Sequence, residues 1–431
     1  MAATTLKVWS LSLGCPKNRV DTEHLLGSLG VNIEAQLTPK TAELLVLNTC
    51  AFIESAVRES VRAILDAIEE LKGVQPKPLF VVCGCLVGRY GQEALAIDLP
   101  EVDLFLSPKE QELWPDKLAA KLGLAKPLLG RLLSTGPSYG WLKIGEGCKH
   151  RCAFCTIPAI RGPLKSVSKQ TLVSEAMSLL GQGVRELICV AQDVTSWGTE
   201  SEDSLKDLLT SLINLPNLLW LRLLYLYPAG LSEDLLRFIG EADLPLLPYF
   251  DIPLQHSHPQ ILQTMGRPFA QDPRYILDKV RKYVPNAVLR TTFIVGYPGE
   301  TEAHFAHLCK FVEEQRFLHV GVFAYEQEEG TSAALLPNQI AQEIKSARLD
   351  ELLSLQQGIS AELLADYLGD ELDVLVDSVN SEWPGLHNGR VWFQAPEVDG
   401  QTYVSGPNVA PGKVVRADIV ETATYDLTAL A

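Results

Sequence analysis

The sequence predicts an α/β protein in three parts: an N-terminal doubly wound parallel sheet, a central partial TIM-like (βα)6 barrel and a small C-terminal antiparallel β-barrel. Two observations lead to this prediction. Short, continuously apolar runs alternate with amphipathic helical patterns over most of the chain, which is typical of parallel sheets. Beyond residue 367 the pattern changes to short alternating strands separated by Gly, Pro and Asn turns, which indicates an antiparallel barrel.

Residues 1–125 form the first predicted domain. Its expected strands are Val8–Leu13, Leu44–Leu47, Leu79–Val82 and Asp103–Leu106, and its expected helices are Asp21–Gly30, Glu54–Leu71, Gln92–Ala96 and Gln111–Leu122. Because parallel strands end at one edge of their sheet, residues that directly follow them are expected to converge. Residues 126–138 contain Gly and Pro residues, which interrupt helices and strands, and are predicted to be a linker.

Residues 139–367 repeat the alternation six times. The expected strands are Tyr139–Ile144, Glu186–Val190, Trp220–Leu224, Tyr249–Pro253, Val288–Val295 and His319–Tyr325. The expected helices are Lys169–Leu180, Ser204–Leu212, Ser232–Ile239, Pro273–Tyr283, Thr301–Gln315 and a long one from about Asn338 to Tyr367. Six such units predict a partial barrel with its active site in the loops that follow the strands. The strands expected in residues 368–431 are ELDVLVDSV, GRVWFQ, TYVSG and KVVRADIVET.

Composition narrows the cellular context. The 431 residues exceed one typical domain, and 47% of them are hydrophobic, enough for a large core. The start of the chain lacks a secretory pattern, and no run approaches the roughly 18 apolar residues of a membrane span. Nine cysteines without a signal peptide therefore favour metal or redox chemistry over disulfides. We expect a cytoplasmic protein that does not contact a membrane.

The charge balance bears on the partner. The formal net charge is −16, and residues 368–431 hold ten acidic and three basic residues, a net charge of −7. Such a barrel repels phosphates and attracts basic proteins. Nucleic acid is therefore disfavoured as the direct substrate, and a basic protein is favoured.

Three cysteines at C-x₃-C-x₂-C spacing follow the first expected barrel strand: Cys148, Cys152 and Cys155. Crowded thiolates of this kind hold an iron–sulfur cluster or a zinc ion. A structural zinc site requires four ligands, and no fourth cysteine or paired histidine lies nearby, since His150 between the ligands is poorly spaced. The spacing thus favours a cubane cluster with one open iron.

Three further cysteines each follow a predicted strand of the first domain. They are Cys15, Cys50 and Cys85, and each lies in a polar or glycine-bearing turn. Scattered cysteines are more often buried structural residues, but the repeated position predicts a second three-thiolate site at one sheet edge. Cys83 alternates in direction with Cys85 along the strand and is expected in the core.

These motifs resemble the radical S-adenosylmethionine methylthiotransferases over essentially the whole chain, with a C-terminal TRAM-like barrel. The aromatic Phe154 before the third cysteine also fits the superfamily pattern. The branch of RimO type, which acts on an aspartate of small-subunit ribosomal protein twelve, is indicated by SLGCPKNRVDTE, VAQDVTSWG, DIPLQH, LRTTFIVGYPGET and GRVWFQAPEVDG.

The resemblance implies two 4Fe-4S clusters and S-adenosyl-L-methionine. Cys148, Cys152 and Cys155 would hold the cluster that cleaves this cofactor to a radical, which takes hydrogen from the aspartate β-carbon. Cys15, Cys50 and Cys85 would hold an auxiliary cluster that supports sulfur insertion. No catalytic side chain beyond these ligands is expected. The implied partners are a basic ribosomal protein and an electron donor such as a flavodoxin or ferredoxin, and the chain is expected to be a monomer.

Contacts to the cofactor are predicted in the loops that follow the barrel strands. Gln192 and Asp193 end the second strand, Gln255 follows the fourth, and Gly296 and Glu300 follow the fifth. A glycine there lets the backbone approach an adenine closely. Two of these loops have a structural alternative: a polar strand cap for Gln192 and Asp193, and a tight turn for the glycine segment.

Three residues are weaker candidates for substrate contact. Arg161 and Lys165 follow the cysteine loop and are also candidates for the cofactor carboxylate, while His256 faces the barrel mouth or is a structural histidine. Cys189 and Cys309 fall in a strand and a helix and are expected in the core.

Two other functions stay open on the sequence. A methylthiotransferase for adenosine in transfer RNA shares the cysteine motifs but calls for a basic terminal barrel. A non-catalytic iron–sulfur carrier or zinc-stabilised binding protein leaves the six-unit barrel unexplained.

Overall fold

A computed structural model of the chain describes residues 5–124, 130–267 and 272–431. They form two compact units. The first comprises Met1–Ser134, Glu146–Arg151 and Cys155–Leu164, and the second comprises Thr135–Gly145, Cys152–Phe154 and Lys165–Ala431. Two stretches of the cysteine loop thus belong to the first unit, whereas the sequence assigned them to the predicted barrel domain. The first part of the predicted 126–138 linker, with the boundary at residue 125, lies outside the described residues.

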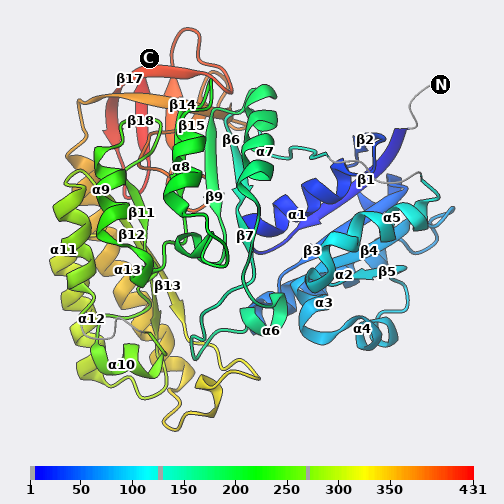
Figure 1. The fold of residues 1–431 in the computed structure, drawn as a ribbon, viewed down its shortest axis with the longest axis horizontal. Helices are drawn as coiled ribbons and strands as arrows, with labels where there is room; N and C mark the ends of the chain where they lie inside the picture. The colour runs from blue at the N-terminus through cyan, green and yellow to red at the C-terminus, as the bar shows by residue number, and fades with distance from the viewer. Residues whose placement is uncertain (1–4, 125–129, 268–271) are drawn as a thin grey trace. The chain divides into compact units, whose positions relative to one another are not determined.

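The first unit is a parallel sheet in the order β2-β1-β3-β4-β5 (Figure 1). Its strands are β1 Thr5–Ser12, β2 Asn32–Ala35, β3 Leu44–Thr49, β4 Leu79–Gly84 and β5 Leu104–Leu106. The direction of winding reverses between β1 and β3, which makes this a doubly wound fold, as predicted. The edge strand β2 was not predicted, because it is mostly exposed and carries no apolar run.

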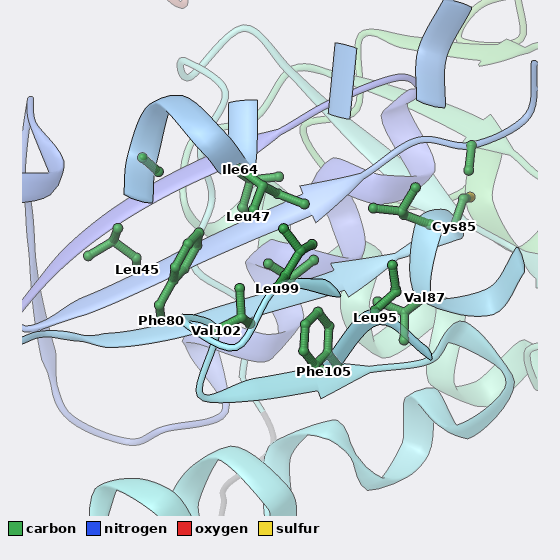
Figure 2. Close-up of a cluster of buried hydrophobic side chains, with 14 of the residues drawn as sticks. Leu45, Leu47, Ile64, Phe80, Cys85, Val87, Leu95, Leu99, Val102 and Phe105 are labelled. Atoms are coloured by element: carbon green, nitrogen blue, oxygen red, sulfur yellow. The ribbon is translucent and has the colours of Figure 1, made fainter. Parts of the chain in front are cut away.

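Two helical layers enclose this sheet. The helices are α1 Pro16–Gly27, α2 Glu54–Glu70, α3 Cys85–Tyr90, α4 Gln92–Asp98 and α5 Trp114–Leu122. One core joins α2, α3 and α4 to one sheet face, and a second core joins α1 and α5 to the other. Figure 2 shows Cys85 at the end of the first core toward which the strand arrows point. Helix α1 begins five residues before its predicted start, because Pro16 suits a first helical turn and buried polar residues obscure the apolar period.

The second unit contains the predicted partial barrel. Its strands are β6 Tyr139–Lys143, β9 Glu186–Val190, β10 Trp220–Leu223, β11 Tyr249–Asp251, β12 Val288–Val295 and β13 His319–Ala324. They form the sheets β10-β9-β6 and β11-β12-β13, joined by a parallel bridge between Leu221 and Leu246. The helices are α7 Lys169–Gly181, α8 Leu205–Ile213, α9 Glu233–Glu241, α10 Pro259–Thr264, α11 Arg274–Tyr283, α12 Glu302–Gln315 and α13 Gln342–Ala365. The short elements near the cysteine loop are β7 Gly145–Glu146, α6 Ile157–Arg161 and β8 Lys165–Ser166.

The C-terminal strands close into a five-stranded barrel in the order β14-β15-β16-β18-β17. They are β14 Glu371–Val379, β15 His387–Arg390, β16 Thr402–Ser405, β17 Val414–Thr422 and β18 Leu427–Leu430. The prediction of a purely antiparallel barrel needs one correction, since β16 and β18 pair in parallel. The sequence did not predict β18, which closes the barrel. Strand β15 also ends at Arg390, because the next residues turn with a hydrogen bond from Gln394 N to Val391 O.

Buried ion pairs and a hydroxyl hydrogen bond connect the C-terminal barrel to the partial barrel within the second unit. Glu186 at the start of β9 accepts hydrogen bonds from Arg222, at 2.7 Å, and from Arg390 of the C-terminal barrel, at 2.5 Å. Asp399 accepts from the Tyr249 hydroxyl at 2.6 Å. Glu186 and Tyr249 begin their strands, so the C-terminal barrel packs on the end of the partial barrel opposite the loops of the predicted site.

Within the described parts of the chain, every helix is too short or too polar to cross a lipid bilayer.

Candidate metal centres

The first candidate centre lies at the carboxyl edge of the N-terminal sheet. Cys15 caps α1 just after β1, Cys50 directly follows β3, and Cys85 directly follows β4 as the first residue of α3. Strands β1 and β3 flank the point where the winding direction changes, which is where open α/β sheets bind their ligands. The fold therefore carries all three predicted ligands to one edge.

The loops that carry these cysteines approach closely. Gly14 has a φ of +89°, and a Cβ atom there would lie 2.5 Å from Cys50 Cβ and 2.7 Å from its Sγ. Burial, together with the neighbouring Cys85 and Cys15, raises the pKa of Cys50 to about 12. Burial also raises the pKa of Cys85, with a further contribution from Cys15. The three thiols therefore act on one another, and a bound metal would have to displace their protons.

Cys83 lies apart from this group, as predicted. It is fully buried and packs in the core beneath α1 and α5, whereas Cys85 packs in the core of the opposite face. The period of two along β4 accounts for this division.

A buried amide, which sequence reasoning missed, ties two of the cysteine loops together. Asn18 Nδ2 donates to Leu13 O at 2.7 Å and to Thr49 O at 3.0 Å, just before Cys15 and Cys50 in the chain. Asn48 Nδ2 donates in turn to Asn18 O at 2.8 Å. The one available signal was a polar residue on the buried side of a helix, where an unpaired amide would be costly.

Arg161 joins the hydrogen-bond network of Asn18. Its Nε donates to Cys85 Sγ at 3.3 Å, and one terminal nitrogen donates to the Asn18 side-chain oxygen. The other donates to Glu146 Oε2 at 2.6 Å, and Asp21 lies 3.5 Å away. Arg161 is only 4% exposed, so its burial argues against the predicted contact with a substrate or with the cofactor carboxylate.

The second candidate centre is the C-x₃-C-x₂-C loop, which leaves the buried strand β6. Gly147 has a φ of +72°, and a Cβ atom there would lie 2.1 Å from Pro163 O. Cys148 N donates to Gly162 O at 3.2 Å, and Cys148 Sγ accepts from the His150 backbone at 3.4 Å. The glycine therefore lets the loop fold back on its own exit segment.

The middle of this loop is anchored within the second unit. Arg267 donates to Cys152 Sγ at 3.4 Å and to Pro253 O at 2.5 Å, and its guanidinium lies 4.8 Å from the Tyr227 ring centroid. Phe154 packs against an apolar cluster around Met265 and Tyr297. Arg267 was not predicted, because it lies after α10, outside the strand-end pattern.

The predicted cofactor residues of the second strand loop differ in placement. Asp193 is buried and caps a short helical turn, where it accepts from the backbone of Thr195 at 2.9 Å, from its hydroxyl at 2.6 Å and from Ser196. This favours the alternative of a strand cap for Asp193. Gln192 beside it is partly exposed.

Gln255 remains a candidate for cofactor contact. It is partly exposed and has a φ of +75°, although it is not a glycine. Backbone hydrogen bonds to Thr292, at 2.7 Å, and from Ile294, at 2.8 Å, hold it beside β12. Strained backbone of this kind is concentrated at functional sites.

Gly296 and Glu300, predicted to contact the cofactor, and His256, a candidate for substrate contact, lie in one buried group, which favours a structural role. Glu300 is 2% exposed and accepts from Gly296 N at 3.0 Å and from Arg348 at 2.7 Å. His256 is fully buried, with Nε2 3.3 Å from Glu300 Oε2 but without hydrogen-bond alignment. A Cβ atom at Gly296 would lie 2.3 Å from Lys345 Cγ, so close packing explains this glycine.

The three other residues singled out in the sequence differ in their exposure to solvent. Lys165 in β8 is exposed, which leaves its side chain available to a substrate. Cys189 is fully buried in β9, as predicted. Cys309 on α12 is only partly buried, so the prediction that it belongs to the core is wrong.

Both sites offer the donors that an iron–sulfur cluster requires. Each provides three cysteine thiols, and at each one sulfur accepts a hydrogen bond from a buried arginine. Among the described residues, no three His, Cys, Asp or Glu side chains are gathered closely enough to hold a single ion. A cubane binds each cysteine at a different iron, so it does not require the three sulfurs to share one ion.

Three family profiles match successive parts of the chain. Residues 7–107 match the Uncharacterized protein family UPF0004, residues 142–312 the Radical SAM superfamily, and residues 368–431 the TRAM domain. Among solved structures, the cobalamin-binding radical S-adenosylmethionine methyltransferase TsrM from Kitasatospora setae has a TM-score of 0.56 at 12% identity, over 90% of this chain and 77% of that one. At this identity the likeness concerns the fold alone.

The fold and the cysteine loop define a radical S-adenosylmethionine enzyme. Relatives that match the full length of the chain identify the family within this class. The ribosomal protein uS12 methylthiotransferase RimO of Nitratidesulfovibrio vulgaris Hildenborough is 57% identical over 99% of this chain and all of its own length. The RimO of Aquifex aeolicus is 42% identical over 98% of this chain and 96% of its own. The chain belongs to this RimO family of methylthiotransferases, and membership implies two 4Fe-4S clusters and S-adenosylmethionine.

Proposed function

We propose that this protein adds a methylthio group to the β-carbon of an aspartate in ribosomal protein uS12. The observation that carries the proposal is a second three-cysteine site, at the switch point of the N-terminal sheet, in a chain that also has the C-x₃-C-x₂-C loop. Cofactor cleavage alone requires one cluster. A second cluster is explained if the protein also inserts sulfur. The full-length relatives named for uS12 support the choice of substrate.

The side chains divide the work between the two centres. When bound, the clusters and S-adenosylmethionine supply the radical and sulfur chemistry, which side chains alone lack. Cys148, Cys152 and Cys155 hold one cluster. Cys15, Cys50 and Cys85 hold the other. Gln255 and Gln192, at the strand ends of the partial barrel, are proposed cofactor contacts, and the exposed Lys165 is a proposed substrate contact.

The C-terminal barrel supports a basic protein substrate. Two of its acids already pair with arginines of the second unit: Asp377 with Arg390 of the same barrel, and Asp399 with Arg290 of β12. The exposed charges that remain are still mainly acidic: Asp370, Glu371, Asp373, Glu382, Glu397, Asp418 and Glu421, against Lys413 and Arg416. Ribosomal proteins are rich in Lys and Arg, whereas the phosphates of transfer RNA would be repelled.

The remaining partners belong to the same proposal. A flavodoxin or ferredoxin is the proposed electron donor, since a cluster that cleaves the cofactor must first be reduced. We propose that the chain acts as a monomer in the cytoplasm, where its ribosomal target is made.

One anaerobic experiment tests the substrate. Reconstituted protein, reductant and S-adenosylmethionine are incubated with uS12 and, separately, with bulk transfer RNA, and the products are analysed by mass spectrometry. We expect a methylthio group on an aspartate of uS12. The same group on adenosine would overturn the substrate choice, and no product on either despite cofactor cleavage would overturn the proposed target altogether.

The division of labour is tested by serine substitutions. Cys152→Ser should abolish reductive cleavage of the cofactor, because it removes a ligand of the cleaving cluster. Cys50→Ser should keep cleavage and abolish methylthiolation. Cleavage is measured as 5′-deoxyadenosine, and Cys189→Ser, in the core, controls for folding. Loss of cleavage in a folded Cys50→Ser protein would contradict the assignment.

A further inference from the structure

Arg161 is a buried cation whose hydrogen bonds join segments far apart in the sequence. It is the last residue of α6, and its side chain is 1% exposed. Its three donor nitrogens reach Cys85 Sγ, Asn18 Oδ1 and Glu146 Oε2. An arginine this deeply buried costs folding free energy unless its partners are well placed, so its position calls for an explanation.

The partners of Arg161 in turn hold the other ligand loops. Asn18, which accepts from the guanidinium, donates to the carbonyls of Leu13 and Thr49, at 2.7 and 3.0 Å. Those carbonyls precede Cys15 and Cys50 by two residues and one residue. One arginine–asparagine pair therefore contacts all three loops of the auxiliary site.

Arg161 also reaches the beginning of the other cysteine loop. Glu146, which accepts from the guanidinium at 2.6 Å, stands two residues before Cys148, and its other oxygen accepts from Gly147 N at 3.0 Å. All of these residues belong to the first unit.

We propose that Arg161 is the positioning residue of the auxiliary cluster: it orients the three ligand loops through Asn18 and raises the reduction potential of the cluster through the hydrogen bond to Cys85. This proposal rests on the proposed function, since it takes Cys15, Cys50 and Cys85 to be cluster ligands. A positive donor beside a ligand sulfur stabilises the added electron of the reduced state, and hydrogen bonds to sulfur are a known control of cluster potentials.

The structure supplies a matched control. Arg267 is also buried and donates to a ligand sulfur, but to that of Cys152, at 3.4 Å. If each arginine tunes the cluster whose ligand sulfur it contacts, replacing Arg161 alters the potential of the auxiliary cluster, and replacing Arg267 leaves that potential unchanged.

The test measures reduction potentials in full-length protein by redox titration followed by electron paramagnetic resonance. The triple variant Cys148→Ser/Cys152→Ser/Cys155→Ser should retain the auxiliary cluster alone. In that background we expect Arg161→Gln to shift the potential to more negative values, because the charge and the sulfur donor are both lost. Arg161→Lys, which keeps the charge but lacks the Nε donor, should shift it less. Arg267→Gln in the same background should leave it unchanged.

The outcomes separate this inference from the function on which it rests. An iron-free protein before any arginine is replaced would overturn the auxiliary cluster itself. Normal iron content with the same potential in Arg161→Gln and Arg161→Lys as in the parent would overturn the role of Arg161 alone. If Arg161→Gln fails to fold, because Glu146 and Asp21 lose their cation, Arg161→Lys decides: an unchanged potential refutes the proposal.

Discussion

At the site of Cys15, Cys50 and Cys85, the space available to a residue matters as much as its chemistry. Gly14 stands directly before Cys15, and the Cβ and Sγ atoms of Cys50 occupy the position that a side chain there would need. The close approach of the two loops thus depends on the absence of one methyl group. Because interiors are closely packed, such contacts transmit small changes directly to the ligands.

Gly14→Ala should therefore cost the protein its auxiliary cluster. The added methyl would lie 2.5 Å from Cys50 Cβ and push the Cys15 and Cys50 loops apart. We expect about half of the iron per chain to be lost, because one of two similar clusters goes, while cofactor cleavage continues. Iron analysis and 5′-deoxyadenosine assays measure the two effects.

Gly73→Ala is the control for backbone strain. Gly73 also has a positive φ, +77°, but nothing lies within 4 Å of the Cβ position. It should lose about 1–2 kcal/mol of stability and keep both clusters. Equal iron loss in both variants would show that strain, not the contact with Cys50, is responsible.

Buried histidines predict how stability depends on pH. Burial lowers the pKa values of His256 and His319 below their ordinary value of 6.5. The unfolded chain then binds more protons than the folded chain below pH 6.5. The stability that these residues contribute is complete above pH 6.5 and is lost as the pH falls below it.

Thermal unfolding between about pH 8 and pH 5 measures this effect. The midpoint should be level at the alkaline end and fall on the acidic side of pH 6.5. His319→Gln should flatten the acidic fall, because glutamine does not titrate. A midpoint that rises toward pH 5 would contradict the buried, neutral state of these histidines.

At the scale of elements, the two barrels of the second unit are held together by charges that are out of contact with water. Glu186 of β9 and Arg390 of β15 are almost fully buried, 204 residues apart in the sequence. Arg390 also pairs with Asp377 of its own barrel at 2.8 Å. Without Arg390, Asp377 loses its partner and Glu186 keeps only Arg222, so buried negative charge is left partly uncompensated.

Arg390→Ala should thus destabilise the protein by about 3–5 kcal/mol. Denaturant unfolding of the purified chain measures the change. Arg416→Ala, in the same barrel, is the control: Arg416 is half-exposed and pairs with Glu371 and Asp373 at the surface, so the loss should stay below about 1 kcal/mol. Similar losses in both variants would contradict the role of burial.

At the scale of the whole molecule, net charge governs which partner is approached. The chain carries −16 overall and −7 in residues 368–431, mostly on exposed side chains. Attraction between exposed charges is screened beyond about 10 Å at 0.1 M salt, so an electrostatic partner binds less well as salt is added.

The KM for uS12 should accordingly rise with ionic strength while kcat changes little. The double variant Asp370→Lys/Glu421→Lys should raise KM already at low salt, because it weakens the acidic surface of the barrel. Glu59→Lys/Glu70→Lys changes the net charge equally, on exposed positions of α2, and should leave KM near the parent value. A KM independent of salt in the parent enzyme would contradict electrostatic attraction.

Much of the fold, and the placement of Cys15, Cys50 and Cys85 at one sheet edge, were predictable from the sequence by itself. Apolar runs with a period of two or about 3.6 residues are local, so they predict the strands, the helices and the two barrels. The cysteines were visible because each follows such a strand. Among the described elements, local patterns missed the polar edge strand β2, the short strands β7, β8 and β18, and the short helices α3, α6 and α10.

Only the tertiary structure decided which polar residues support the ligands. Asn18 meets Thr49 across 31 residues of sequence, Arg161 meets Cys85 across 76, and Arg267 meets Cys152 across 115. A buried polar group is stable only if it finds a partner, and chain topology, not periodicity, brings that partner near. For the same reason, the burial of Glu300, His256 and Arg161, each predicted to contact a ligand, became apparent only in the folded chain.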